Sequence, residues 1–253
     1  MILTRQGNKT RIADKIYLKF PAHKTYVELF FGAGGMFFNK PVASNNICND
    51  FDNDVFNLWN EVKFNKDALF KEIETLPLHN TLWNTYKNQK PIDPTLRAAI
   101  FLFYSNFGYM GKPNSLHFPA NQNYRDMILN RIDKTFEKLK SVLFMNEDFR
   151  NVLNKIHFRN QSERQDTFIY SDPPYLGTLD YGSGWNEKDS EDCFDITFNS
   201  GMNAAMSEFD HPFILQQVKE RGLHLHIIGE RQNMKNRRTE ILITNYQTAK
   251  TLF

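Results

Sequence analysis

The sequence predicts an α/β protein built on a mostly parallel sheet, with its functional site at the carboxyl ends of the strands. Three observations support this class. The apolar run Thr25–Phe31 is typical of a strand, and it leads through Gly32–Gly35 into a short helix at Met36–Lys40, as a Rossmann-type unit begins. A second predicted strand, Asn46–Asp50, ends in an acid. The β-branched and aromatic run Thr167–Ser171 indicates a buried strand, and the motif Asp172-Pro173-Pro174-Tyr175 directly follows it.

The glycine turn suits a ligand that approaches the backbone closely, because glycine has no Cβ to keep the ligand away. Asp50 follows Gly32 by roughly the 20 residues at which such folds place the acid that binds a ribose. Asp50 has a structural alternative as a helix cap, a role for which Asp52 and Asp54 compete. A Walker phosphate loop is excluded, since no Lys-Ser or Lys-Thr pair follows the glycines.

The other α/β elements lie on both sides of a helical block. Apolar residues at helical spacing predict a first helix from Ile12 to Phe20, which Pro21 ends. Beyond the block, we expect in order a strand at Val142–Asn146, a helix at Arg150–Ile156, a strand at Ala204–Ser207, a helix at His211–Arg221, and strands at Leu223–Ile228 and Glu240–Thr244. The polar stretch Gly177–Asp195 predicts a mobile loop beside the site.

Residues 53–141 interrupt this pattern and are expected to be mostly helical. Apolar residues share helix faces within Val55–Val62, Leu69–Leu76, Leu96–Phe103 and Ile128–Leu139. Asp93 and Pro94 have the residue types that cap and open a helix. The predicted organisation is one domain made of residues 1–52 and 142–253, with a helical subdomain of residues 53–141 inserted into it.

The third motif is Asp172-Pro173-Pro174-Tyr175, directly after the strand at Thr167–Ser171. The two prolines stop the strand and fix the backbone, which places the Asp172 carboxylate and the Pro173 carbonyl at the sheet edge where ligands bind in open α/β folds. Two oxygens and the flat ring of Tyr175 form a site for a planar ring with an exocyclic amine. The structural alternative is a strand end followed by a Pro-Pro turn with a surface tyrosine.

Composition sets further bounds. The chain has 253 residues, 41% of them hydrophobic, with a net charge of only +2, so bulk charge does not indicate a polyanion partner. Cys48 and Cys193 lie outside any CxxC spacing, which predicts neither a zinc site nor a disulfide and suits a reducing cytoplasm. We expect no metal, no signal segment and no membrane span. The basic run Lys219–Arg238 predicts either a polyanion contact or a solvated face.

The ordered motifs resemble those of the Dam-like N6-adenine DNA methyltransferases of the D12 class, in the α arrangement that places target recognition between cofactor and catalytic motifs. The resemblance covers nearly the whole chain. It rests on segments that match the family in order along the sequence: Gly7–Lys9, Phe31–Gly35, Asp50, Asn106–Gly111, Asp148–Phe149 and Asp172–Tyr175. It implies a Rossmann-like methyltransferase fold with a mixed, mostly parallel seven-stranded sheet.

The resemblance also implies the site residues. The cofactor would be S-adenosylmethionine, with S-adenosylhomocysteine as the product. Its implied contacts are Lys9, Phe31, Gly32, Ala33, Gly34, Asp50, Asp148, Phe149 and Asp172. The catalytic residues would be Asp172, Pro173, Pro174 and Tyr175, acting on the N6 amine of an adenine that is flipped out of double-stranded DNA. Two oxygen acceptors would localise the lone pair on the amine nitrogen and direct it at the sulfonium methyl.

DNA is the expected partner. Asn106 and Tyr109 lie in the segment that resembles the mouth of the family's recognition hairpin, and the residues expected to contact phosphate are Lys112, Arg125, Arg131, Lys235, Arg237 and Arg238. A cognate restriction endonuclease is a further expected partner, with the protein a monomer or weak dimer in the cytoplasm. Arg5, Asn8 and Met110 depart from the family pattern, and the segment 112–123 is short, so no recognition sequence is carried over.

Other functions remain open from the residues alone. The same chemistry fits a cytosine N4 amine or an RNA substrate. A catalytically idle module that binds cofactor or DNA would keep the fold, although the intact Gly32–Gly35 and Asp172–Tyr175 argue against it. A nicotinamide oxidoreductase would use a similar glycine turn, but the sequence offers no evident residues for its substrate chemistry.

Overall fold

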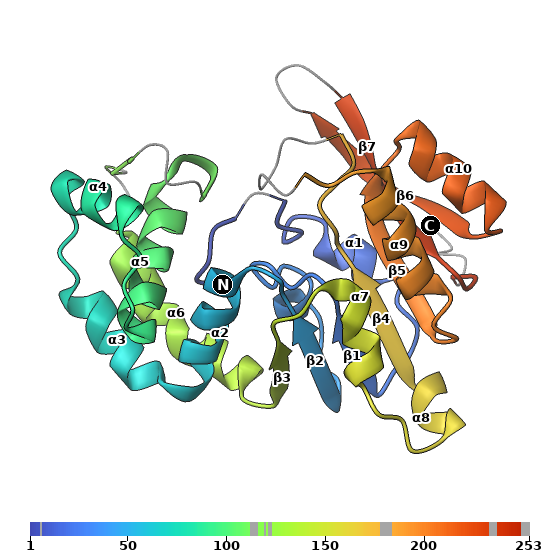
Figure 1. Cartoon of the computed structure of the whole chain (residues 1–253), viewed down its shortest axis with the longest axis horizontal. Helices are drawn as coiled ribbons and strands as arrows, with labels where there is room; N and C mark the ends of the chain where they lie inside the picture. Colours follow the sequence, from blue (N-terminus) through green and yellow to red (C-terminus); the bar gives the residue numbers. More distant parts are fainter. Residues whose placement is uncertain are drawn as a thin grey trace.

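The computed structural model describes residues 1–5, 7–111, 116–118, 120, 123–177, 184–232 and 237–248. Its strands form a seven-stranded sheet in the order β3-β2-β1-β4-β5-β7-β6 (Figure 1). The strands are β1 (Thr25–Glu28), β2 (Asn45–Asn49), β3 (Val142–Met145), β4 (Thr167–Ser171), β5 (Asn203–Phe209), β6 (His224–Gln232) and β7 (Arg237–Thr244). The pairs from β3 to β5 are parallel, and β7 runs antiparallel to β5 and to β6. The predicted fold class is confirmed.

Alternating residues of the central strands serve two separate cores. Val27 of β1 and Ile169 of β4 point to a core shared with three helices: α7 (Phe149–Val152), α9 (Glu187–Phe198) and α10 (Pro212–Glu220). Their neighbours Tyr26 and Phe168 point to the opposite face, where they pack with α1 (Ala13–Tyr17). All five residues of β4 are buried, as expected of a central strand covered on both faces.

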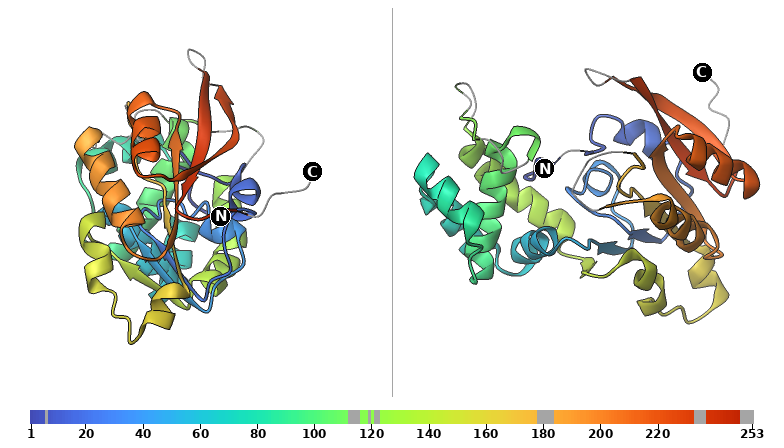
Figure 2. Two further views of the ribbon diagram at one scale, coloured as in Figure 1. Left: turned by 90° about the vertical axis from the view of Figure 1, so that its right-hand side faces the viewer. Right: turned by 45° about the horizontal axis from the view of Figure 1, so that its top comes forward.

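A group of helices lies beside the β3 edge of the sheet (Figures 1 and 2). It comprises α2 (Asn53–Phe64), α3 (Lys66–Thr75), α4 (Asn80–Asn88), α5 (Pro94–Phe107) and α6 (Tyr124–Leu139), and the 3₁₀ turn η2 (Tyr109–Gly111) follows α5. Capping side chains fix the first residues of two of these helices. The Asp93 side chain accepts from the Leu96 N–H at α5, and the Asp52 side chain accepts from the first turn of α2.

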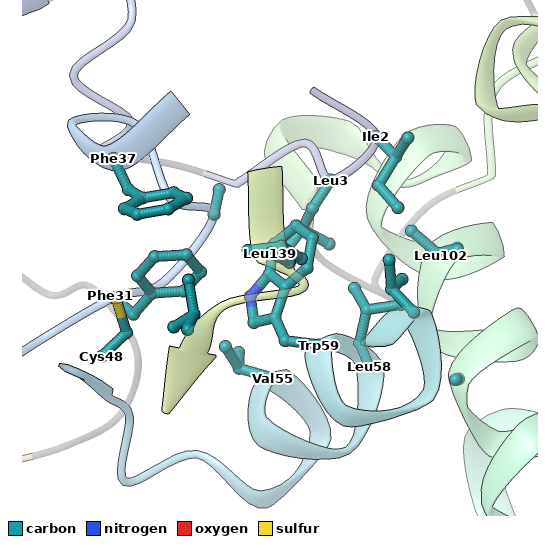
Figure 3. Close-up of a cluster of buried hydrophobic side chains, with 14 of the residues drawn as sticks. Ile2, Leu3, Phe31, Phe37, Cys48, Val55, Leu58, Trp59, Leu102 and Leu139 are labelled. Atoms are coloured by element: carbon teal, nitrogen blue, oxygen red, sulfur yellow. The ribbon is translucent and has the colours of Figure 1, made fainter. Parts of the chain in front are cut away.

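The N-terminal residues join the helices to the sheet domain. Ile2 and Leu3 are fully buried in the same hydrophobic cluster as Trp59, Leu102 and Leu139, which come from three helices or their ends (Figure 3). Gly111 has φ +77°, and a Cβ there would lie 2.7 Å from the Thr4 carbonyl oxygen. The first residues of the chain therefore pack within the helical group, and the chain then passes to the edge of the sheet.

Several predicted bounds are wrong. The strand expected to reach Phe31 ends at Glu28, and the helix expected at Met36–Lys40 is a single 3₁₀ turn, η1 (Phe37–Asn39). The helix expected at Arg150–Ile156 splits into α7 and the 3₁₀ turn η3 (Leu153–Lys155). The expected loop Gly177–Asp195 contains the start of α9 at Glu187, where Asn186 and Asp189 form a capping box.

Two short helices were not predicted, α4 and α8 (Gln161–Gln165), because few apolar residues mark them. Within the described ranges, no helix has the length and apolar character required to cross a membrane.

Candidate active site

The glycine turn and the Asp-Pro-Pro-Tyr motif follow neighbouring parallel strands. Glu28 of β1 lies opposite Tyr170 of β4, and the Leu29 N–H donates to the Tyr170 carbonyl at 3.1 Å. The chain order of strands reverses direction here, since β2 and β3 lie on one side of β1 and β4 lies on the other. Such a switch point is where open α/β sheets bind their ligands. The structure therefore brings the two predicted motifs to one edge.

Backbone conformation and space explain the glycines. Gly32 has φ +51°, and a Cβ built there meets nothing within 4 Å, so this side of the turn is open. Gly34 has φ +71°, and its Cβ would lie 2.5 Å from the Phe38 ring. Gly35 must lack a Cβ for a different reason. That atom would lie 2.3 Å from Asn8 Oδ1 and 2.8 Å from the Lys9 backbone nitrogen. The glycine turn thus seats the Asn8–Lys9 segment.

Asp50 fastens this turn. Its Oδ2 accepts from the Gly32 N–H at 2.6 Å, and its Oδ1 accepts from the Asp52 N–H at 2.9 Å. Burial raises the pKa of Asp50, and the nearby Arg5 guanidinium opposes the rise. The helix cap of α2 is Asp52, so the cap alternative for Asp50 is wrong. A carboxylate has about four acceptor positions, which leaves Asp50 capacity for hydroxyl donors.

Two other residues predicted to contact the cofactor, Phe31 and Ala33, are buried on the side of the turn that faces the core. Phe31 is 2% exposed and packs against Trp59, whose Nε1 donates to the Gly32 carbonyl at 2.8 Å. Ala33 is also buried. Phe31 and Ala33 therefore contribute packing, while the open side of the turn is at Gly32.

Lys9 enters the site from the N-terminal segment and meets the Asp-Pro-Pro-Tyr motif. Its Nζ lies 2.7 Å from Asp172 Oδ1 and 3.5 Å from Glu240 Oε1, and it also donates to the Gly7 carbonyl at 3.1 Å. The Lys9 side chain is only 3% exposed. Sequence reasoning assigned Lys9 to the cofactor alone, whereas the structure places its ammonium between two carboxylates.

Asp172 is the most informative of these groups. Although Lys9 lies close, the buried Oδ1 accepts no hydrogen bond of good geometry from the described residues, so this contact is an ion pair rather than a directed hydrogen bond. Burial raises the pKa of Asp172, and the Lys9 ammonium counteracts it. A partly exposed carboxylate beside Pro173 and Pro174 suits an incoming N–H donor once Lys9 moves away from it.

Tyr175 is not a surface residue, so the structural alternative for the motif is wrong in that respect. The ring is 8% exposed, packs edge-on against Phe209 with centroids 4.6 Å apart, and has Lys9 Nζ 4.6 Å from its centroid. Its hydroxyl donates to Glu240 Oε1. Little of the Tyr175 ring is exposed, so a base can stack on it only if a neighbouring side chain, such as Lys9, moves.

Asp148 and Phe149 lie farther along the same edge, after β3. Asp148 caps α7 by accepting from the Arg150 N–H at 2.9 Å and pairs with the Arg150 guanidinium. Phe149 is 5% exposed and packs against Phe30 and Trp185, with Arg150 4.4 Å from its ring centroid. The structure therefore gives both residues local packing roles beside the turn.

The residues predicted to contact DNA are scattered over the helical group and β7. Tyr109 is 58% exposed. Arg125 donates to the Leu76 carbonyl, Arg131 donates to the Met1 carbonyl at 3.2 Å, and Arg238 donates to the Gly177 carbonyl at 3.3 Å. Lys112, Lys235 and the side chain of Arg237 lie outside the described residues.

Asn106 has a different environment from the one expected. It is 5% exposed, donates to the Ile2 carbonyl at 3.0 Å and to the Leu102 carbonyl at 2.9 Å, and accepts from the Thr4 hydroxyl at 2.8 Å. Its side chain is therefore used inside the protein to hold the N-terminal segment, with no exposed face for DNA.

Three further residues of the site were missed. Asn49 donates to the Leu29 and Glu147 carbonyls, both at 3.0 Å, and so ties the ends of three strands together. Glu208 accepts from the Leu176 N–H at 2.9 Å, and burial raises its pKa to about 8. Glu240 is described above. For Glu208 and Glu240, the available signal was an acid within an apolar strand, because a charged side chain is rarely buried there without a specific partner.

The fold and site together define a class. A mixed seven-stranded α/β sheet, with a glycine turn after β1, an acid after β2 and a proline-fixed carboxylate after β4, is a Rossmann-like methyltransferase arrangement. A family model described as D12 class N6 adenine-specific DNA methyltransferase matches residues 6–237. The chain belongs to this family, as its motifs predicted.

Two curated relatives agree with this family membership. The DNA adenine methylase of Haemophilus influenzae is 28% identical over 184 residues, which are 67% of this chain and 61% of that protein. The type II methyltransferase M1.LlaDCHI of Lactococcus lactis subsp. cremoris is 22% identical over 274 residues, 95% of this chain and 93% of its own length. Among solved structures, the N-terminal domain of human METTL16 in complex with SAH covers 94% of this chain and 68% of its own, with a TM-score of 0.43 and 8% identity.

Proposed function

We propose that this protein transfers a methyl group from S-adenosylmethionine to the N6 amine of an adenine flipped out of double-stranded DNA. The observation that carries the proposal is the place of Asp172 at the switch point of the sheet, beside the glycine turn, where its buried Oδ1 pairs with Lys9 but accepts no directed hydrogen bond from the described residues. Family membership supports the reaction class.

The residues present fit the cofactor. The open side of Gly32 admits a group close to the backbone, and Asp50 keeps acceptor capacity for the ribose hydroxyls. Asp148 and Phe149 lie at the next strand end, where the adenine end would lie. When bound, S-adenosylmethionine supplies an electrophilic methyl group on a sulfonium.

The chain's own part in the reaction is to orient the amine. An adenine amine is a weak nucleophile because its lone pair is delocalised into the ring. If Asp172 and the Pro173 carbonyl each accept one amine hydrogen, the nitrogen becomes more tetrahedral and its lone pair localises. This is positioning and preorganised electrostatics. Pro174 fixes the backbone that holds both acceptors, and Tyr175 packs on the extruded ring.

On the DNA side, we propose that residues 53–141 form the recognition subdomain attached to a catalytic domain of residues 1–52 and 142–253. Tyr109 is exposed in η2, just after α5, and Arg131 is exposed on α6, so both are available to DNA. Lys112, Arg125, Lys235, Arg237 and Arg238 complete the proposed contacts with phosphate, which set affinity and register but read no sequence. Asn106 acts indirectly, by holding the N-terminal segment.

The cellular setting follows from the class of protein. We propose a cytoplasmic monomer or weak dimer that acts on genomic DNA, with a cognate restriction endonuclease as a further partner. The relative M1.LlaDCHI is named a type II methyltransferase, which supports that setting.

Asp172→Ala tests the proposal. We expect labelled methyl transfer to unmethylated duplex DNA to fall by at least about a thousandfold, since the acceptor that orients the amine is lost. S-adenosylmethionine binding, measured by calorimetry, should remain within about tenfold, because Asp50 and the glycine turn are untouched. Near-wild-type turnover in this variant would refute the role of Asp172.

A further inference from the structure

The buried carboxylate Glu240 has no place in the chemistry described above, yet it touches two residues of the site. Its Oε1 accepts from the Tyr175 hydroxyl and lies 3.5 Å from Lys9 Nζ. Glu240 belongs to β7, opposite Phe209 of β5, and its side chain is 4% exposed. A carboxylate buried this deeply needs charge or hydrogen-bond partners, and Lys9 and Tyr175 are the partners it has among the described residues.

Lys9 occupies the acceptor that the substrate needs. Its ammonium lies 2.7 Å from Asp172 Oδ1, and the same ammonium lies 4.6 Å from the Tyr175 ring centroid. An amine that is to donate to Oδ1, and a base that is to pack on Tyr175, both require Lys9 to withdraw. Because Lys9 is 3% exposed, it has no direct route to water that would compensate the lost ion pair.

Glu240 offers the compensation. The difference between 2.7 Å to Asp172 and 3.5 Å to Glu240 means that a small movement of the flexible lysine side chain exchanges one carboxylate for the other. After that exchange, the ammonium keeps a buried counter-charge while Asp172 is released. Glu208, another buried acid nearby, already accepts from the Leu176 and Phe209 N–H groups, at 2.9 and 2.7 Å, and so its oxygens are used by the backbone.

We propose that Glu240 is a positioning residue that receives Lys9 when the target base takes its place on Asp172. In the absence of DNA, Lys9 holds Asp172 as an ion pair and covers the Tyr175 ring. On entry of the base, Lys9 moves to Glu240, and Asp172 and the ring become available together. Glu240 thereby also keeps the Tyr175 hydroxyl in place during the exchange.

The test is a double-mutant cycle between Lys9 and Glu240, and it rests on the proposed function. Glu240→Gln keeps an oxygen for the Tyr175 hydroxyl but removes the charge that receives Lys9. With labelled S-adenosylmethionine and PCR-amplified duplex DNA, we expect this variant to lose about 10- to 100-fold in single-turnover rate, the worth of one charge-assisted contact. Lys9→Met removes the competing cation. In that background, Glu240→Gln should cost less than about threefold, because no lysine remains to be received.

Two further variants separate the charge of Glu240 from its hydrogen bond to Tyr175 and from a general effect of removing a carboxylate. Tyr175→Phe keeps the ring and removes the hydroxyl that Glu240 holds, so it measures how much of the loss passes through that hydrogen bond. Glu220→Gln, on the exposed face of α10, is the matched control and should equal wild type in rate. Calorimetric binding of S-adenosylhomocysteine, with thermal unfolding, gives a readout independent of turnover, and both should stay close to wild type in Glu240→Gln.

The outcomes are distinct. If the wild type transfers no methyl group to DNA, the proposed function fails. If the wild type is active and Glu240→Gln is equally active, or loses the same factor with and without Lys9, the exchange of Lys9 between carboxylates is overturned. An equal loss in Tyr175→Phe and Glu240→Gln that persists without Lys9 would also overturn it, since Glu240 would then act through the tyrosine hydroxyl alone.

Discussion

Gly35→Ala is a sharp test of how the glycine turn builds the site. A Cβ at this position would lie 2.3 Å from Asn8 Oδ1 and 2.8 Å from the Lys9 backbone nitrogen, whereas uncrowded heavy atoms pack at roughly 3.5 Å or more. The Asn8 side chain can turn away, but the Lys9 backbone can move only if the whole segment shifts by several tenths of an ångström. That segment delivers Lys9 to Asp172.

The magnitude follows from this overlap. Overpacking of this kind typically costs about 1–3 kcal/mol, and each kcal/mol lowers Tm by about 2–4 °C for a chain of this size. Backbone strain adds nothing, since Gly35 does not have the positive φ that Gly32 and Gly34 adopt. We therefore expect a moderate loss of stability together with a marked loss of turnover.

Thermal unfolding and labelled methyl transfer, measured on the same preparations, are the assays. The matched control is Gly229→Ala on β6, where a Cβ meets only Lys15 Nζ at 4.0 Å, and both quantities should stay near wild type. If Gly35→Ala is as stable and as active as wild type, the N-terminal segment does not rest on the turn as described, and its role in placing Lys9 is refuted.

Three other changes have defined outcomes. Burial raises the pKa of Glu28 from 4.5 to about 8, so the folded protein keeps a proton that the unfolded chain releases between those values, and stability falls as pH rises through that window. Glu28→Gln should flatten the decline of Tm from about pH 5 to about pH 8, and an unchanged slope would contradict this. Asn106→Ala leaves the buried Ile2 carbonyl without its donor and should cost about 1–3 kcal/mol, with earlier proteolysis at the N-terminus; equal stability in denaturant would argue against it. Trp59→Phe removes the donor to the Gly32 carbonyl and should cost about 1 kcal/mol or somewhat more and weaken S-adenosylhomocysteine binding, which calorimetry would detect or exclude.

Short-range signals made much of the fold predictable. The run Thr167–Ser171 is strand β4 to the residue, because β-branched and aromatic side chains suit a strand buried on both faces. Asp93 and Pro94 start α5 as expected, since a capping side chain acts within one turn. The helix α4 was missed because Trp83 is the one buried side chain among its residues, so tertiary packing rather than its own pattern forms it.

The site was predictable in its motifs but not in its partners. Asp50 and Asp172 stand at strand ends, where their chemistry could be inferred from position. Glu240 could not be assigned in this way, because its importance depends on a contact with Tyr175 that spans 65 residues of sequence. Asn106 was assigned to DNA from local resemblance, whereas packing of the N-terminal segment decides its environment.

The most direct test of the central claim is the identity of the methylated nucleoside. PCR-amplified duplex DNA is incubated with the protein and S-adenosylmethionine, digested to nucleosides and analysed by mass spectrometry. We expect N6-methyl-2′-deoxyadenosine with the wild-type chain and none with Asp172→Ala. Methylation found only on cytosine N4 or only on an RNA substrate, or the same product from Asp172→Ala, would contradict the account.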